Sequence, residues 1–258
     1  LVWLTVVRQL LPIDGDFSAH LTCIGGTPLH SAAELDLVNV INLLINSGCS
    51  ASQADRNGQL PIHFAIQYGH TRSVSLLLQK LNTNNVLTEN GMSLLHWAVF
   101  YKQVQVVNTL LRSNHRSVES LYVDKTSLKP ITVPFPIVEA VHIANIPLTR
   151  ILAEEGININ LAVQRPLEDL PSIYESETRV GCLNVYHKTM ISDWSILHEA
   201  ASKMETRIAE GLVDILLNHG AAANIKCSNG ITPLMVAVLR SRDDPRVVRS
   251  LLQSGANP

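Results

Sequence analysis

The sequence repeats itself every 33 residues, and this period constrains the fold more than any other feature. Three phrases begin 33 residues apart, GGTPLHSAA at Gly25, GQLPIHFAI at Gly58 and GMSLLHWAV at Gly91. The same interval separates four leucines, Leu11, Leu44, Leu77 and Leu110. Such a period is typical of stacked repeats, in which each repeat buries its apolar faces against its neighbours. The sequence therefore predicts a solenoid.

Each repeat has the pattern of a turn followed by two helices. Gly25 can adopt the positive φ of a tight turn, Thr27 suits the N-cap of a helix, and Pro28 suits its first position. His30 lies three residues after the cap, close enough for a polar contact back to it. The segment 37–45 has apolar residues at helical spacing, which predicts a second, longer helix with one buried face.

This order of elements resembles the ankyrin repeat, of which TPLH at 27–30 is the most characteristic phrase. The resemblance implies an all-α ankyrin-repeat solenoid of stacked helix-turn-helix units with short β-hairpin-like turns, forming a single domain over 1–258. Because the chain begins with Leu1 and stops at GANP, we expect a fragment of a longer protein. The expected parts are a partial repeat at 1–23, repeats at 24–56, 57–89 and 90–122, a divergent repeat at 132–164, an insertion loop at 165–191, a repeat at 192–228 and a truncated repeat at 229–258.

Where the sequence departs from the repeat pattern, it predicts local differences in stability and in the length of the loops. The fourth repeat has Val133 in place of the turn glycine, Phe135 in place of the cap and Val138 in place of the histidine. Its helix start should be the weakest, since a cap contributes about 1 kcal/mol. The insertion at 165–191 is a second recognition element or a disordered excursion, because loops of that length are uncommon in compact arrays. Extra residues at 203–207 and 243–244 should bulge outward between helices.

Composition limits the class of partner and the compartment. A formal net charge of −2 and a pI near 6.6 give no electrostatic case for nucleic acid, which needs a basic face. The four cysteines form no CxxC pair and no N-x-S/T sequon occurs, so we expect reduced thiols and a cytoplasmic location, with the nucleus or the cytosolic side of a membrane protein as alternatives. The opening run LVWLTVVRQLL is too short to span a membrane, so no membrane insertion is expected.

No motif in the sequence predicts a catalytic, metal-binding or cofactor-binding site. His30, His63, His96 and His198 occupy equivalent places in successive repeats. Packed helices lie roughly 8–10 Å apart, whereas zinc holds an imidazole nitrogen at about 2 Å, so these histidines cannot share a metal and should act as polar clasps. There is no GxSxG elbow, P-loop, HExxH or dinucleotide fingerprint. We therefore expect no catalytic residue, no metal and no cofactor.

The resemblance also implies where a partner would bind, because ankyrin arrays use their concave side. Two sets of residues map to it. The turn tips offer Arg56, Asn57, Gln59, Glu89, Asn90, Met92 and Trp194, and the short helices offer Glu34, Gln67, Tyr68, Phe100, Tyr101 and His142. Tyr68, Phe100 and Tyr101 stand out, since aromatic residues dominate the energetics of interface centres. As alternatives, Phe100 packs over its own helix pair and Trp194 seals the insertion, while Trp97 should pack between repeats.

The expected function is a non-catalytic scaffold or adaptor module that binds a protein partner on its concave face. Other hypotheses are a substrate-recruiting or regulatory segment of a multidomain enzyme such as a ubiquitin ligase or kinase, the cytosolic domain of a membrane channel, and an effector that mimics host adaptors. Framework residues specify the stack, so the sequence leaves the identity of the partner open.

Overall fold

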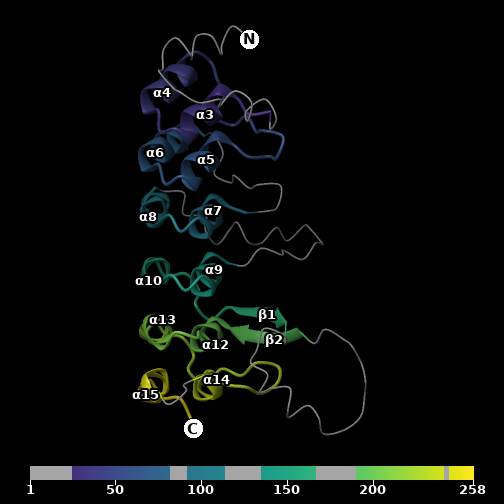
Figure 1. Ribbon diagram of the computed structural model, residues 1–258, viewed down its shortest axis with the longest axis vertical. Coiled ribbons are helices and arrows are strands. Elements are labelled where there is room, and N and C mark those ends of the chain that lie inside the picture. Colours follow the sequence, from purple (N-terminus) through teal and green to yellow (C-terminus); the bar gives the residue numbers. More distant parts are fainter. Residues whose placement is uncertain (1–24, 82–91, 114–134, 167–189, 241–243) are drawn as a thin grey trace. The chain divides into compact units, whose positions relative to one another are not determined.

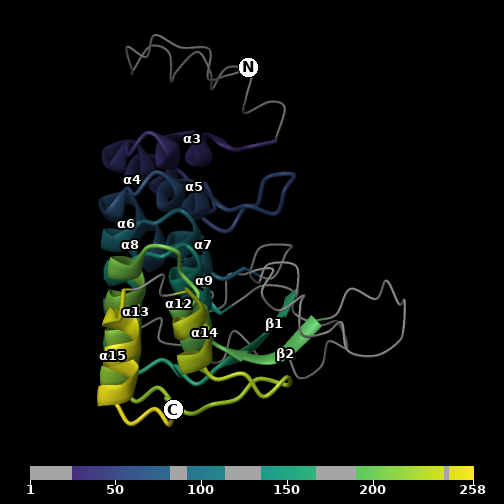
Figure 2. The same ribbon diagram turned by 60° about the horizontal axis from the view of Figure 1, so that its bottom comes forward.

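The computed structural model describes residues 25–81, 92–113, 135–166, 190–240 and 244–258. It divides the chain into two compact units, unit 1 (Leu1–Val133) and unit 2 (Pro134–Pro258). The described residues contain twelve helices and one two-stranded sheet. This largely helical architecture confirms the predicted fold class, and the two units are shown in Figures 1 and 2.

Unit 1 consists of three helix pairs, each formed by a short first helix and a second helix of nine or ten residues. The pairs are α3 (Pro28–Glu34) with α4 (Val38–Asn46), α5 (Pro61–Gln67) with α6 (Thr71–Lys80), and α7 (Leu94–Phe100) with α8 (Val104–Arg112). The first helices pack on one another in chain order, as do the second helices. Two parallel layers result (Figure 1).

Unit 2 repeats this layering and adds an antiparallel pair of strands. Its elements are α9 (Pro136–His142), α10 (Ile146–Glu154), β1 (Ala162–Pro166), β2 (Met190–Ser195), α12 (Ile196–Ala201), α13 (Thr206–Asn218), α14 (Pro233–Arg240) and α15 (Arg246–Gln253). Helix α12 packs between α9 and α14, and α13 between α10 and α15.

The first helices start as the sequence predicts, with a reciprocal clasp between cap and histidine. The Thr27 backbone N–H donates to His30 Nδ1 at 2.9 Å, and the Thr27 hydroxyl lies 2.8 Å from the same nitrogen. Ser195 and His198 form the equivalent clasp. The structure adds a contact that the sequence did not predict. His30 Nε2 lies 3.0 Å from the Gln59 carbonyl oxygen of the next repeat, so the histidine also joins neighbouring repeats.

The core depends on one small residue in each first helix and on leucines in the second helices. Ala32, Ala65 and Ala98 are at most 2% exposed, as are their equivalents Ala140 and Ala200. An alanine keeps the helix thin, which allows successive first helices to approach closely. Leu44, Leu77 and Leu110, which mark the 33-residue period, are all buried. The repeat period is therefore also the period of the core.

The turn between the two helices of a repeat requires a left-handed backbone. Gly69 has φ 78°, and the equivalent Asp36, Lys102 and Ala144 have φ 54°, 58° and 57°. A side chain disfavours this conformation. Three of these four turns are therefore strained.

We expect Lys102→Gly to raise the free energy of unfolding by about 0.5–1 kcal/mol, because relief of the strain exceeds the entropic cost of glycine. Urea unfolding followed by circular dichroism would measure the change. Gln105→Gly, at an exposed position within α8, is the matched control and should destabilise by about 1 kcal/mol. A loss of stability in Lys102→Gly would contradict the interpretation.

The first helix of the fourth repeat, α9, has no side-chain N-cap, as its sequence predicts. Phe135 precedes α9 and provides no side-chain cap, whereas the Asn145 side chain accepts from the Leu148 N–H and caps α10. Val133 lies outside the described residues. The sequence reasoning thus located the missing cap, and the low stability that we expect at this helix start stays a prediction.

Two features differ from the sequence-based expectations. The ends of the predicted insertion loop are strands, since Arg165 pairs with Ile191 and Pro166 with Met190 in the β1–β2 ladder. The extra residues near 203–207 lengthen a helix instead of bulging outward, because α13 has 13 residues where the other second helices have eight to ten. The physical reason is that adding a turn to an amphipathic helix extends its buried face.

Candidate partner-binding surfaces

Three aromatic side chains of unit 1 form a surface where α5 and α7 end; we call Tyr68, Phe100 and Tyr101 the aromatic cluster. Tyr68 is 50% exposed and Phe100 is 53% exposed, while Tyr101 is half-buried. Phe100 and Tyr101 meet edge to face with ring centroids 5.2 Å apart, and Tyr101 contacts Trp97 at 5.4 Å. With half of its side chain exposed, Phe100 packs only in part on Tyr101 of its own repeat, and its role as a contact residue stays a prediction.

Hydrogen bonds between repeats fix the helix ends that carry the cluster. His70 Nε2 lies 2.9 Å from the Glu34 carbonyl oxygen, and Gln103 Nε2 donates to the Gln67 carbonyl oxygen at 2.7 Å. These contacts connect the turn of one repeat to the first helix of the repeat before it. Because the final carbonyls of a helix lack partners within the helix, the contacts also cap α3 and α5. The half-buried Gln67 therefore contributes its backbone to the scaffold.

Beneath the cluster, Trp97 packs between repeats as predicted. It is buried, its Nε1–H donates to the His63 carbonyl oxygen at 3.1 Å, and its ring meets the His63 ring edge-on at 5.4 Å. His63 itself is fully buried. The aromatic cluster therefore packs, through Tyr101, on a buried Trp97 that contacts with His63 hold in place.

The Tyr68 ring is held from two sides. It stacks on the His70 ring with centroids 6.1 Å apart and an interplanar angle of 20°. Partial burial, then the charge of the Glu34 carboxylate and the hydrogen bond that it accepts, raises the pKa of Tyr68. The hydroxyl therefore stays protonated at neutral pH. A fixed aromatic ring next to a carboxylate is the most distinctive chemistry of this surface.

The turn tips of unit 1 are more polar. Arg56 and Asn57 are exposed, and Gln59 and Met92 are half-buried, whereas Glu89 and Asn90 lie outside the described residues. The buried Asp55 holds this tip, since its Oδ1 accepts from the backbone N–H groups of Asn57 and Gln59 at 2.9 and 2.8 Å. Sequence reasoning missed Asp55, although an aspartate two residues before Asn-Gly is a turn signal.

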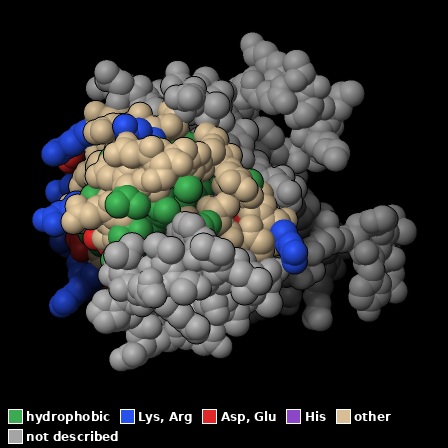
Figure 3. Space-filling view, turned by 90° about the horizontal axis from the view of Figure 1, so that it is seen from above, with side chains coloured by type: hydrophobic (Ala, Val, Ile, Leu, Met, Phe, Trp, Pro, Cys, Tyr) green, Lys and Arg blue, Asp and Glu red, His purple; other side chains and the backbone are tan. Residues whose placement is uncertain are grey.

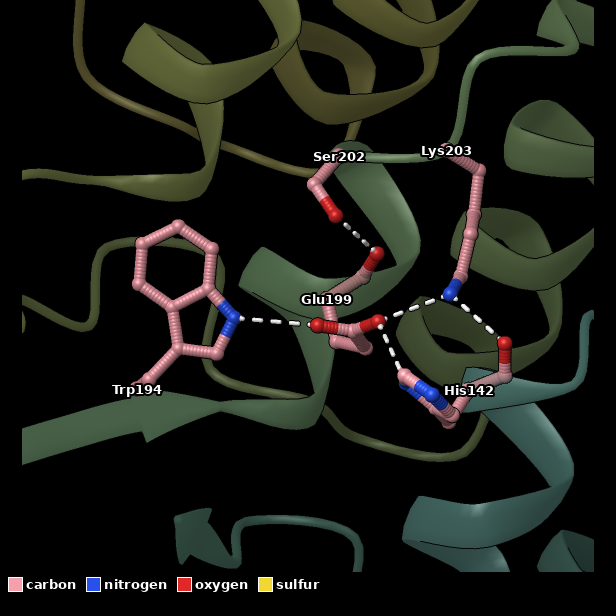
Figure 4. Close-up of polar contacts among 5 residues, drawn as sticks. All are labelled: His142, Trp194, Glu199, Ser202 and Lys203. Atoms are coloured by element: carbon pink, nitrogen blue, oxygen red, sulfur yellow. Dashed lines mark hydrogen bonds and ion pairs between the residues drawn. The ribbon is translucent and has the colours of Figure 1, made fainter. Parts of the chain in front are cut away.

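His142 belongs to a polar network in unit 2 that centres on the buried Glu199 (Figure 4). Its Nδ1 lies 3.3 Å from Glu199 Oε1, and the Lys203 ammonium donates to the same oxygen at 2.7 Å. The other carboxylate oxygen accepts from Trp194 Nε1–H at 3.3 Å. Lys203 also donates to the His142 carbonyl oxygen at 2.8 Å. Although the His142 side chain is 62% exposed, its imidazole is already engaged.

Trp194 corrects the prediction of an exposed binding residue at a turn tip. Its exposed fraction is 0%, and its ring lies against the His198 ring with centroids 4.8 Å apart. Spacing places Trp194 in register with Gln59 and Met92, but the β1–β2 pairing runs directly into α12 and carries the indole inward. Trp194 therefore anchors the strands to the repeat and is not available to a partner.

Both units also expose apolar side chains that the sequence pattern did not predict. In unit 2, Met204, Met235 and Val238 are 52–69% exposed, and Arg240 Nη1 contacts the Met204 sulfur at 2.7 Å. In unit 1, Leu43 is 59% exposed, and hydrophobic side chains gather on the end that carries α3 and α4 (Figure 3). Met235 stands where four other repeats have histidine, and this substitution was the available signal.

The described part of the chain offers no site for catalysis by metal ions. No cluster of three or more His, Cys, Asp or Glu side chains there could hold a metal ion. The search for spans covered the same residues, and it found no helix with the length and apolar character needed to cross a membrane. Among the cysteines in these ranges, Cys49 and Cys227 carry free thiols.

Comparison with known proteins agrees with the repeat architecture. The family model of ankyrin repeats (3 copies) matches residues 39–122 and 161–258, which is more than half of the chain. An ankyrin repeat protein of Rickettsia felis is 29% identical over 142 residues, which are 55% of this chain and 48% of the relative. In this alignment the chain spans about half the length of the curated relative.

Solved structures share the fold. An ankyrin repeat domain from Acinetobacter baumannii has a TM-score of 0.63 at 19% identity, covering 89% of this chain and 98% of that domain. The ankyrin repeat domain of Bcl-3, a member of the IkappaB family, has a TM-score of 0.60 at 24% identity, covering 89% and 83%. Together with the family match and the repeated cap–histidine clasps, these findings show that the chain belongs to the ankyrin repeat family.

Proposed function

We propose that this chain is a non-catalytic scaffold or adaptor module that binds a protein partner on the surface around the aromatic cluster. Ankyrin repeat domains are in general protein–protein interaction modules, and the family is typically non-enzymatic. The observation that carries the proposal is the exposure of Tyr68 and Phe100 on helix ends that contacts between repeats hold in place. Prepositioned aromatic side chains give contact area with little loss of conformational entropy on binding.

The surface has the composition expected of an interface centre with a polar rim. The half-buried Gln67 and Tyr101 adjoin the two exposed rings in sequence. The turn tips add Arg56, Asn57 and Gln59 as further candidates, as the family resemblance implies. Aromatic anchors surrounded by polar contacts are typical of energetic hot spots.

We expect the double variant Tyr68→Ala/Phe100→Ala to lose at least tenfold in affinity for the partner, since each hot-spot aromatic contributes about 2 kcal/mol. The test is affinity capture from a lysate of cells that make the protein, quantified by mass spectrometry and followed by titration of the recovered partner. Unfolding of the variant should be nearly unchanged, because both side chains are half-exposed.

Leu43→Ala is the matched control, because Leu43 is also an exposed apolar residue of unit 1 but lies on the second-helix layer. If Leu43→Ala and the double variant retain the same partners equally well, the aromatic cluster is not the binding surface. The turn tips would then be tested next, through Arg56→Ala/Asn57→Ala.

A further inference from the structure

Tyr68 combines an open ring surface with a fixed orientation. One face of the ring stacks on His70, and half of the side chain is exposed to solvent. His70 is itself fixed by its contact with the Glu34 carbonyl oxygen. The ring face is therefore presented to a partner without a need for rearrangement.

Glu34 places a negative charge at the edge of this ring. It is the last residue of α3 and half-buried, and its carbonyl oxygen contacts His70, on whose ring Tyr68 stacks. Partial burial raises the pKa of the Tyr68 hydroxyl, and the Glu34 carboxylate also raises it through its charge and a hydrogen bond. Within the described parts of the chain, no lysine or arginine forms an ion pair with Glu34. Its negative charge is thus not neutralised by a basic side chain from those parts.

The charged residues around the aromatic cluster favour a cation at its Tyr68 end, near Glu34, over its Phe100 and Tyr101 end, near Lys102. The next acidic residue, Asp36, follows Glu34 in the α3–α4 turn and accepts a hydrogen bond from Ser73. Lys102 is exposed in the α7–α8 turn directly after Tyr101, so the Phe100 and Tyr101 end carries a positive charge instead. A cationic side chain would therefore be attracted to Glu34 and Tyr68 and repelled from Lys102.

We propose that Tyr68 and Glu34 form a recognition site for an arginine side chain of a protein partner. A guanidinium is planar, so it can stack on the exposed part of the Tyr68 ring while its N–H groups donate to the Glu34 carboxylate. Apolar residues that flank the arginine would contact Phe100 and Tyr101. The proposal rests on the proposed function, and it adds the chemical class of the segment that the module binds.

Selection of random peptides displayed on phage against the whole chain tests the proposal, followed by titration of the best peptide by fluorescence anisotropy. We expect the selected peptides to share an arginine flanked by apolar residues. Replacing that arginine with citrulline, which has the same shape but no charge, should weaken binding at least tenfold. In the Glu34→Gln variant the same replacement should cost less than threefold, because the counter-ion is gone.

Glu154→Gln is the control for the loss of one negative charge, since Glu154 is exposed in α10 of unit 2, and there the citrulline penalty should stay at least tenfold. The proposal is overturned if no peptide is selected, if the peptides lack a cation, or if citrulline costs the same in the parent chain and in Glu34→Gln. Peptides without a cation that bind the parent chain but not Tyr68→Ala/Phe100→Ala would overturn the arginine site and still support the proposed function. If no selected peptide binds through the cluster and Tyr68→Ala/Phe100→Ala also keeps its partners, the arginine site and the proposed function both fail.

Discussion

Glu199→Ala is expected to lower the free energy of unfolding of unit 2 by about 3 kcal/mol. Glu199 is 4% exposed, and its carboxylate accepts from both the Lys203 ammonium and the buried Trp194 indole. Removing one partner of a buried ion pair costs about 3–5 kcal/mol, because the other charge stays behind without compensation. The expected value lies at the low end, since the Lys203 side chain is 16% exposed and keeps its bond to the His142 carbonyl oxygen.

Urea unfolding at pH 7, with hydrogen exchange of the α12 amides, would measure this loss. Glu199→Gln should cost less, about 1–2 kcal/mol, because the amide oxygen can still accept from Trp194. Glu154→Ala, an exposed glutamate on α10, is the control and should change stability by less than about 0.5 kcal/mol. A similarly small change for Glu199→Ala would show that water replaces the lost contacts.

Acidification from pH 7 to pH 4 is expected to destabilise unit 1 by about 3 kcal/mol through His63 alone. Burial lowers the pKa of His63 from 6.5 to about 4, and the Leu60 N–H donates to its Nδ1 at 2.8 Å. Protonation would place a charge in the core and remove that acceptor. The folded state therefore binds this proton less readily than the unfolded state does.

The sign follows from linkage. With the folded pKa below the unfolded one, the stabilisation is complete above pH 6.5 and is lost as the pH falls toward 4, and a difference of this size corresponds to about 3 kcal/mol. Burial also lowers the pKa values of His30 and His198, so His30 adds to the loss in unit 1 and His198 destabilises unit 2 with the same sign. Unfolding free energies measured in urea at pH values from 4 to 8 would give the curve.

His63→Asn should flatten this curve, because the asparagine oxygen can accept from the Leu60 N–H without titrating. The variant should be less stable than the parent chain at pH 7, since it leaves a cavity beside Trp97. The control is Val74→Ala, at a buried position of unit 1 without a titratable group, which should lower stability at every pH and leave the slope unchanged. An equal slope in the parent chain and His63→Asn would rule out His63 as the acid-sensitive group.

Local pattern was sufficient for most of the stack. Thr27, Pro28 and His30 specify a helix start through contacts that span three residues, and the structure has those contacts. The leucine period predicted the buried face of the second helices, because helical geometry repeats every 3.6 residues irrespective of the neighbours. The missing cap at Phe135 followed from the same rules.

For the candidate site residues, spacing along the sequence predicted some positions correctly and one wrongly. Spacing alone identified Tyr68, Phe100 and Tyr101, because the exposed end of a first helix falls at a fixed distance from each TPLH-like phrase, and two of these rings are indeed half-exposed. The same spacing was wrong for Trp194. Its burial depends on pairing between Val163 and Trp194, which are separated by a long segment, and no local pattern encodes such a partner.

The sequence by itself determined the helix pairs and their caps, since these depend on interactions between residues close in the chain. The phrases that encode them also identified the family. Only the tertiary structure decided which polar groups join neighbouring repeats, such as His70 with Glu34, Gln103 with Gln67, and Lys203 with His142. Those contacts cross 36 residues or more of sequence. They form because stacking brings a turn of one repeat against the helix end of the repeat before it, where backbone carbonyls without helical partners need donors.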